Sequence, residues 1–197
     1  MRDQHKSQQL TPEYYESIGR MILSFQALED AISGAIYNLT LPEKRLKPNV
    51  DLFLMINELS FKNRLKLLRN HSERNDSEYY LWVGCPKEKE RRDLIPDILR
   101  QLREMLSKAA YMEEKRNQII HSMWSPSDDG VSQMARRLKI RAKPKKISIS
   151  NEMVSQESIL ELAEEMQTLR NSISNASRLL SGLLKEKIAN QPMEGTS

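Results

Sequence analysis

The residues of this chain best suited to acid–base chemistry beside a phosphate are an arginine, an asparagine and a histidine within six positions. Arg116 and Asn117 are adjacent, and His121 follows four residues after Asn117. Residues four apart share one face of an α-helix, so the spacing predicts that Asn117 and His121 lie together. An imidazole moves protons near neutral pH, and a guanidinium holds a phosphate through its planar fork of donors. The stretch is therefore a candidate site for chemistry on an anionic substrate.

The segment before His121 is predicted to be a helix that ends close to this residue. The breaker-rich sequence SPSDDG at 125–130 stops any longer helix. Arg116 falls in the middle of an apolar stripe, and two interpretations are open: its side chain snorkels off the rim of a core, or it is held in the core wall and aimed at an anion. The stripe consists of Ile98, Leu102, Met105, Ala109 and Met112, followed by Ile119, Ile120 and Met123.

The stretch from Arg116 to His121 resembles the R-x4–6-H motif of HEPN domains (higher eukaryotes and prokaryotes nucleotide-binding), which often carry Asn directly after the arginine. The resemblance implies an all-α bundle, usually homodimeric, and a metal-independent ribonuclease with Arg116, Asn117 and His121 as catalytic residues. Two copies of the motif across one cleft would supply a base and an acid. A toxin branch of the family has Tyr two residues after the histidine. This chain has Met123 there, which argues against the subgroup whose Tyr is modified by a partner nucleotidyltransferase.

Composition sets further expectations. A length of 197 residues suits one domain, and the single Cys85 excludes an internal disulfide and fits a reducing compartment. No motif for a metal, a phosphate-binding loop or a cysteine nucleophile is present, so no metal and no cofactor are expected. The N-terminus has no apolar run, and no segment reaches the length of a membrane span. We therefore expect a cytoplasmic protein without a membrane partner.

Helical periodicity predicts four helical regions. The first begins at Thr11-Pro12 and runs to about Leu39, and the second covers about 51–71 with a break at Ser60. The third spans Lys89 to His121 and is divided at Pro96. The last begins after a cap at Ser155 or Ser158 and runs to about Ala189. Residues 71–79 and 122–130 are predicted to turn.

The predicted fold is an all-α, HEPN-like antiparallel helical bundle with a small basic β-hairpin or loop insertion before the last long helix. A single domain is expected over 11–189, with 122–150 forming the turn and the basic hairpin insertion. Alternation of apolar and polar residues at 147–150 favours the hairpin. Residues 1–10 are expected to be a disordered start and 190–197 a flexible tail.

A basic segment, defined here as Val131–Ser150, contains seven cations and no acid, whereas the net charge of the whole chain is only +4. Such a run is typical of a phosphate-binding patch, here for RNA. A solvated loop is the alternative interpretation. The predicted RNA-binding residues are Arg136, Arg137, Lys139, Arg141, Lys143, Lys145 and Lys146.

A second charge, Glu29, lies in the apolar stripe of the first helix. Burying a charge without a partner raises the free energy of the folded state by several kcal/mol. We therefore expect Glu29 to pair with Arg116 and to fix the position of its guanidinium. A buried ion pair that only sets the register of the two helices is the alternative.

Together with the HEPN resemblance, which implies a ribonuclease, these patterns favour a metal-independent endoribonuclease that cleaves RNA by attack of the 2′-hydroxyl, leaving 2′,3′-cyclic phosphate ends. The resemblance adds homodimerisation, a toxin or antiviral defence role, and an antitoxin or regulatory partner as a further candidate. One alternative is a non-catalytic HEPN-like module that binds nucleic acid, a nucleotide or a partner protein. Another is a helical interaction module whose last helix pairs between chains.

Overall fold

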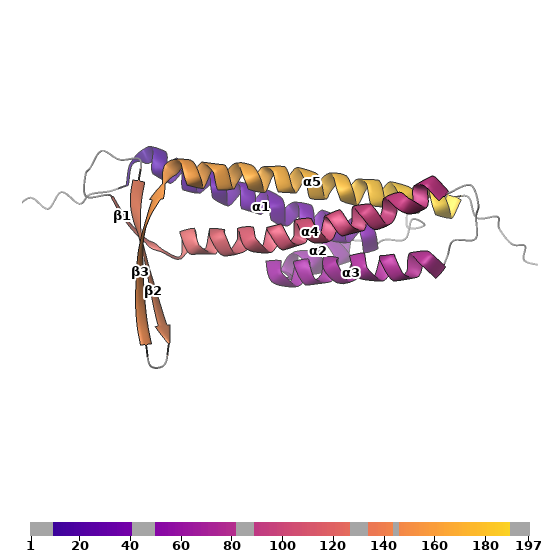
Figure 1. Ribbon diagram of the computed structural model, residues 1–197, viewed down its shortest axis with the longest axis horizontal. Coiled ribbons are helices and arrows are strands. Elements are labelled where there is room, and N and C mark those ends of the chain that lie inside the picture. The colour runs from indigo at the N-terminus through magenta and orange to yellow at the C-terminus, as the bar shows by residue number, and fades with distance from the viewer. Residues whose placement is uncertain (1–9, 41–49, 82–88, 127–133, 144–145, 190–197) are drawn as a thin grey trace, which may run out of the picture. The chain divides into compact units, whose positions relative to one another are not determined.

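The computed structural model describes residues 10–40, 50–81, 89–126, 134–143 and 146–189 (Figure 1). Within these ranges the chain is mostly helical and carries one small antiparallel sheet. The helical character and the hairpin before the last helix are confirmed, whereas the likeness to a HEPN bundle stays a prediction. The helices are α1 (Pro12–Thr40), α2 (Val50–Glu58), α3 (Phe61–Leu81), α4 (Lys89–Ile120) and α5 (Gln156–Ala189), and the strands are β1 (Met123–Pro126), β2 (Met134–Lys143) and β3 (Lys146–Ser155).

Two compact units share the three longest helices. The first unit comprises Met1–Ala27 and Tyr111–Thr168, so it holds the first half of α1, the end of α4, the sheet and the start of α5. The second comprises Leu28–Ala110 and Leu169–Ser197. The single domain predicted over 11–189 stays a prediction. The predicted disordered start and flexible tail lie outside the described residues, except for Leu10.

Hydroxyl caps define the starts of α1 and α5. The backbone N–H of Tyr14 lies 3.4 Å from Oγ1 of Thr11, and Pro12 occupies the first helical position, where an N–H would have no helical acceptor. At α5, the backbone N–H of Ser158 donates to Oγ of Ser155 at 3.0 Å. Ser155 therefore caps α5, which decides between the two serines that the sequence left open.

Two predicted interruptions of helices are wrong. Helix α3 continues through residues 71–79 to Leu81. A polar run without Gly or Pro contains no residue that breaks a helix, so it can remain helical. Helix α4 runs through Pro96, which removes one backbone hydrogen bond but leaves the neighbouring turns intact. Ile95 and Leu99 on either side of Pro96 are buried, and this packing maintains the helix.

The corner between α2 and α3 depends on Arg64. Its Nε donates to the carbonyl of Leu59 and its Nη2 to the carbonyl of Asn57, both at 2.9 Å. Its Nη1 donates to Oγ of Ser33 in α1 at 3.2 Å. These bonds satisfy carbonyls that the end of α2 leaves without helical partners. The predicted break at Ser60 is confirmed, because α2 ends before it and α3 begins after it.

The sheet has the order β1-β2-β3, with both pairings antiparallel. Strands β2 and β3 pair along their whole length, from Met134 opposite Ser155 to Lys143 opposite Lys146. Strand β1 covers only the first part of β2, because its pairing runs from Pro126 opposite Ala135 to Met123 opposite Leu138. Residues 122–130 were expected to turn, so β1 corrects that prediction. Its partner is distant in sequence and four residues carry too little periodicity to indicate a strand.

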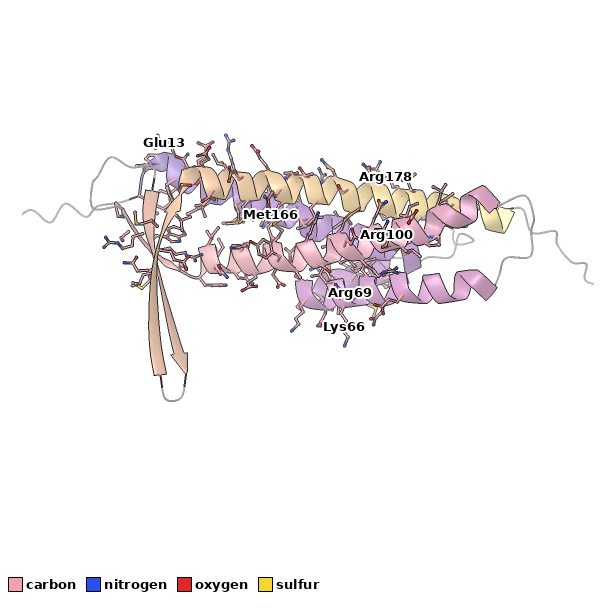
Figure 2. The ribbon with its side chains drawn as sticks, viewed as in Figure 1. Glu13, Lys66, Arg69, Arg100, Met166 and Arg178 are labelled. Atoms are coloured by element: carbon pink, nitrogen blue, oxygen red, sulfur yellow. The ribbon has the colours of Figure 1, made fainter. Side chains whose placement is uncertain are left out.

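Each unit has its own apolar core. In the second unit, Figure 2 labels Arg69 on α3. Its Nη2 donates to Oγ of Ser107 in α4 at 3.0 Å. The core of this unit includes Leu28, Ile32, Ile56, Leu68, Leu99, Leu102, Leu106 and Ile173. The core of the first unit includes Tyr14, Met21, Phe25, Met112, Ile119, Ala135, Ile159 and Met166.

Replacing Arg64 by Met should destabilise the protein by about 2–3 kcal/mol, because the carbonyls of Asn57 and Leu59 lose a charged donor. Urea denaturation followed by circular dichroism measures the change. Arg100 is the matched control, because within the described ranges its exposed side chain pairs with Asp97 and Glu104 of its own helix. Arg100→Met should leave the stability nearly unchanged. Equal losses in the two variants would contradict the role assigned to Arg64.

Candidate functional site

The end of α4 is closed by three donors from the residues that follow it. The backbone N–H of His121 donates to the carbonyl of Asn117 at 3.1 Å, and the hydroxyl of Ser122 donates to the carbonyl of Gln118. The indole Nε1 of Trp124 donates to the carbonyl of Ile119 at 2.9 Å. These bonds occupy carbonyls that a helix end leaves free and hold the turn in place. The side chain of His121 is exposed on this turn.

Arg116 is partly buried one turn before His121. Its Nη1 donates to Oδ1 of Asn117 at 2.8 Å, and its guanidinium carbon lies 5.1 Å from the ring centre of Phe25 in α1. Its Nε is buried and has no hydrogen-bond partner among the described residues. Met112 and Ile119, on the same stripe, are buried. The guanidinium thus packs on an aromatic ring and bonds to an amide at the edge of the core, instead of extending into solvent.

Asn117 connects the two ends of the motif in different ways. Its side-chain amide binds Arg116, whereas its backbone carbonyl accepts the N–H of His121. The described contacts therefore orient the arginine through the Asn117 side chain and the histidine through the helix backbone. Glu29 is partly exposed and belongs to the second unit, so its pairing with Arg116 stays a prediction.

The pairing of β1 with β2 places the first part of β2 beside the strand that follows the motif. Met123 lies opposite Leu138 at the last position of this ladder. His121 is two residues before Met123, and Lys139 is one residue after Leu138. The chain therefore enters β1 from α4 at the level of the sheet where β2 continues beyond β1 into Lys139, Arg141 and Lys143. Met123 and Leu138, which are 15 positions apart in the sequence, become neighbours through this register.

The predicted RNA-binding residues do not form one uniform surface. Arg136 is partly exposed, but Arg137 is only 8% exposed and forms an ion pair with Glu152 of β3. Nη1 of Arg137 also lies 3.5 Å from Oε1 of Gln118 in α4. This inward placement weakens the predicted RNA contact of Arg137. Strand β2 contains Lys139, Arg141 and Lys143, and strand β3 begins with Lys146. Lys145 lies outside the described residues.

Tyr14 and Trp124 anchor the sheet to α1, and neither was singled out from the sequence. The hydroxyl of Tyr14 donates to the carbonyl of Val154 in β3 at 2.6 Å. The rings of Tyr14 and Trp124 lie 5.6 Å apart at an angle of 59°. Burial raises the pKa of Tyr14 to about 12, and a hydrogen bond with the Ala135 backbone opposes this shift. Tyr14 lies one turn before Ile18, so extending the predicted stripe of the first helix by one turn would have found it.

A groove of about 500 Å³ lies on the first unit, away from the motif residues. It runs between α1 and α5, where Nε2 of Gln167 donates to Oγ of Ser24 at 3.1 Å. Leu23 on its edge is largely exposed. The groove is mainly apolar and offers no cluster of titratable groups. Its lining residues are Arg20, Leu23, Ser24, Leu160, Ala163, Glu164, Gln167 and Thr168.

Among the described residues, no three His, Cys, Asp or Glu side chains gather closely enough to hold a metal ion. None of the helices in the described ranges is both long and apolar enough to cross a membrane. Comparison of the chain with protein-family models, with curated proteins and with solved structures gives no match.

Tyr14→Phe should destabilise the protein by about 1–2 kcal/mol, because the carbonyl of Val154 loses its hydroxyl donor while the ring packing is kept. Tyr15→Phe is the matched control, since Tyr15 is 56% exposed and should not change stability. Both free energies of unfolding can be measured in urea. The anchoring role is wrong if the two substitutions have the same effect.

The same hydroxyl predicts a loss of stability at alkaline pH. The folded pKa of about 12 lies above the ordinary value of 10.0, so the contribution of this group is complete below pH 10 and is lost as the pH rises toward 12. The stability difference between wild type and Tyr14→Phe should therefore shrink between these two pH values. A difference that stays constant over this range would contradict the raised pKa.

Proposed function

We propose that this protein is a metal-independent endoribonuclease that acts as a homodimer in the cytoplasm. The observation that carries the proposal is the register of β1 on β2. It brings the exposed His121 turn next to a strand that continues into Lys139, Arg141 and Lys143. A proton-transfer group thus lies two residues before the strand that pairs with β2, and β2 itself continues into a line of cations that suits a nucleic-acid backbone.

The proposed reaction is a transesterification within RNA. The 2′-hydroxyl loses its proton to a general base, its oxygen bonds to the adjacent phosphorus, and the bond from phosphorus to the 5′-oxygen breaks as that oxygen gains a proton. The products end in a 2′,3′-cyclic phosphate and a 5′-hydroxyl. His121 suits both proton transfers, and its exposure supports access to substrate. A homodimer would bring two copies of His121 to one phosphate, one as base and one as acid.

Arg116 is proposed to stabilise the charge that develops on the phosphoryl oxygens. An arginine is always ionised, and its planar fork matches these oxygens. The bond from Nη1 to Oδ1 of Asn117 supports a role of Asn117 as positioner of Arg116. Glu29 is proposed to support the guanidinium from α1. The resemblance of the motif to HEPN ribonucleases agrees with these roles, and it extends the proposal to a toxin or antiviral defence function with an antitoxin or regulatory partner.

One observation favours a second candidate, a non-catalytic HEPN-like module that binds nucleic acid, a nucleotide or a partner protein. The guanidinium of Arg116 packs on Phe25, bonds to Asn117 and has a buried Nε. Those contacts also suit an arginine that only stabilises the end of α4. Binding of RNA without cleavage would distinguish this module from the ribonuclease.

Purified protein should cut RNA in the presence of EDTA and leave 2′,3′-cyclic phosphate ends, detectable by mass spectrometry of the fragments. His121→Ala should lower the rate by a factor of about 10²–10⁴, the range that general acid–base catalysis supplies. His71→Ala is the matched control, because His71 lies in α3 and contacts Thr40. Cleavage that requires Mg²⁺, or that persists in His121→Ala, would reject the mechanism.

Replacing Lys139, Arg141 and Lys143 by Gln should weaken RNA binding for all sequences, because these residues are proposed to neutralise backbone phosphates. For single-stranded RNA the slope of log affinity against log salt should fall by about 2, from about 0.7 per lost contact. The control variant replaces the exposed Lys62, Lys66 and Lys108 and removes the same charge. If both triple variants change the slope equally, net charge explains the binding, and the basic segment has no special part.

A further inference from the structure

Arg137 differs from the other described cation of the basic segment, Arg136, by its burial. It lies opposite Glu152 in the β2–β3 ladder and forms an ion pair with this carboxylate. Its other terminal nitrogen, Nη1, lies 3.5 Å from Oε1 of Gln118. The side chain therefore reaches from the base of the hairpin to the last turn of α4.

Gln118 is the point where this bridge meets the motif. Its Nε2 donates to Oε1 of Glu114 at 3.2 Å, and its backbone carbonyl accepts the hydroxyl of Ser122. It is adjacent to Asn117, and Ser122 is adjacent to His121. Bonds thus connect Arg137 through Gln118 to the residues that flank both ends of the His121 turn.

A second link runs through the strand on the other side of Arg137. Trp124 of β1 is the register partner of Arg137, and its indole donates to the carbonyl of Ile119 at 2.9 Å. Trp124, Arg137 and Glu152 therefore occupy one row across the three strands. Two members of this row, Trp124 and Arg137, bond to consecutive residues at the end of α4.

We propose that Arg137 and Gln118 form a positioning pair that transmits phosphate binding on the basic segment to the Asn117–His121 turn. The inference rests on the proposed function, because it assigns RNA to the basic segment. Lys139 follows Arg137 by two residues, so both positions share one face of β2. A phosphate bound at Lys139 would displace strand β2, which carries Arg137. The hydrogen bond of Arg137 to Gln118 depends on direction, so it would pass this displacement to the end of α4. Proton transfer is sensitive to displacements of about 1 Å.

Trp124 provides a readout that does not require cleavage. The chain has two tryptophans, so Trp82→Phe leaves Trp124 as the single tryptophan, whose emission can be excited selectively over that of the tyrosines. The probe is a 2′-O-methyl RNA oligonucleotide, which binds as RNA does but lacks the attacking hydroxyl. Binding to the wild-type sequence in this background should change the emission of Trp124. Gln118→Met should bind the probe with a Kd within about twofold and reduce the emission change, because it removes the bond of Gln118 to Arg137 and leaves the β1–β2 pairing in place.

Controls separate positioning from general destabilisation. Gln101→Met changes an exposed glutamine of the same helix and should keep both binding and the emission change. Gln118→Glu keeps an oxygen acceptor for Arg137 and should restore the emission change. In cleavage assays Gln118→Met should lower kcat by about tenfold and leave KM within about twofold.

The outcomes distinguish the two claims. Binding of the probe with an emission change, but no cleavage of ordinary RNA, would overturn the ribonuclease proposal and leave the coupling standing. An emission change of undiminished size in Gln118→Met, or a wild-type protein that binds without any change in emission, would overturn the coupling. A protein that does not bind the probe at all would overturn both.

Discussion

The buried charge of Arg137 is the constraint on which the first unit depends. A guanidinium removed from water without a partner would cost several kcal/mol, and here Glu152 supplies the opposite charge across the β2–β3 ladder. A slip of one residue in this ladder would turn Arg137 to the other face of the sheet and separate it from Glu152. The ion pair therefore selects one register, and that register determines which residues meet at the end of α4.

The sheet is small, so its attachment to the helices needs more than apolar area. Tyr14 contributes a ring that packs on Trp124 and a hydroxyl that reaches the carbonyl of Val154. Trp124 in turn donates to the carbonyl of Ile119. Each of these side chains combines a large apolar surface with one directional bond, which fixes an orientation that packing alone would leave loose. The hairpin and the motif turn consequently share the same anchors.

The two charged residues of the motif lie in different environments. Arg116 is held by Phe25 and Asn117 and has a buried Nε, whereas His121 is exposed on the turn after α4. A group that stabilises charge benefits from a rigid, partly dry setting, because its donors are already oriented. A group that exchanges protons needs access to substrate. The end of a helix offers both settings within two turns, and this suits the proposed division of labour.

The sequence by itself determined the local features of this protein. The apolar period of 3.6 residues indicated α1, α4 and α5, and the hydroxyl caps at Thr11 and Ser155 indicated where two of them begin. The basic hairpin was predictable from alternation within a short stretch. These features depend on neighbours in the chain, so composition and spacing carry them.

Only the tertiary structure decided which side of the hairpin faces the helices. Arg136 and Arg137 are the same residue at adjacent positions, and alternation alone says that they point to opposite faces. Which of them is buried depends on the contact with Gln118 of α4, which lies outside the hairpin and is brought there by the packing of the sheet on the helices. The pairing of strand β1 with β2 also depends on this arrangement. Non-local pairing lowers the free energy only when all its partners are present together, so it is a property of the fold and not of any single segment.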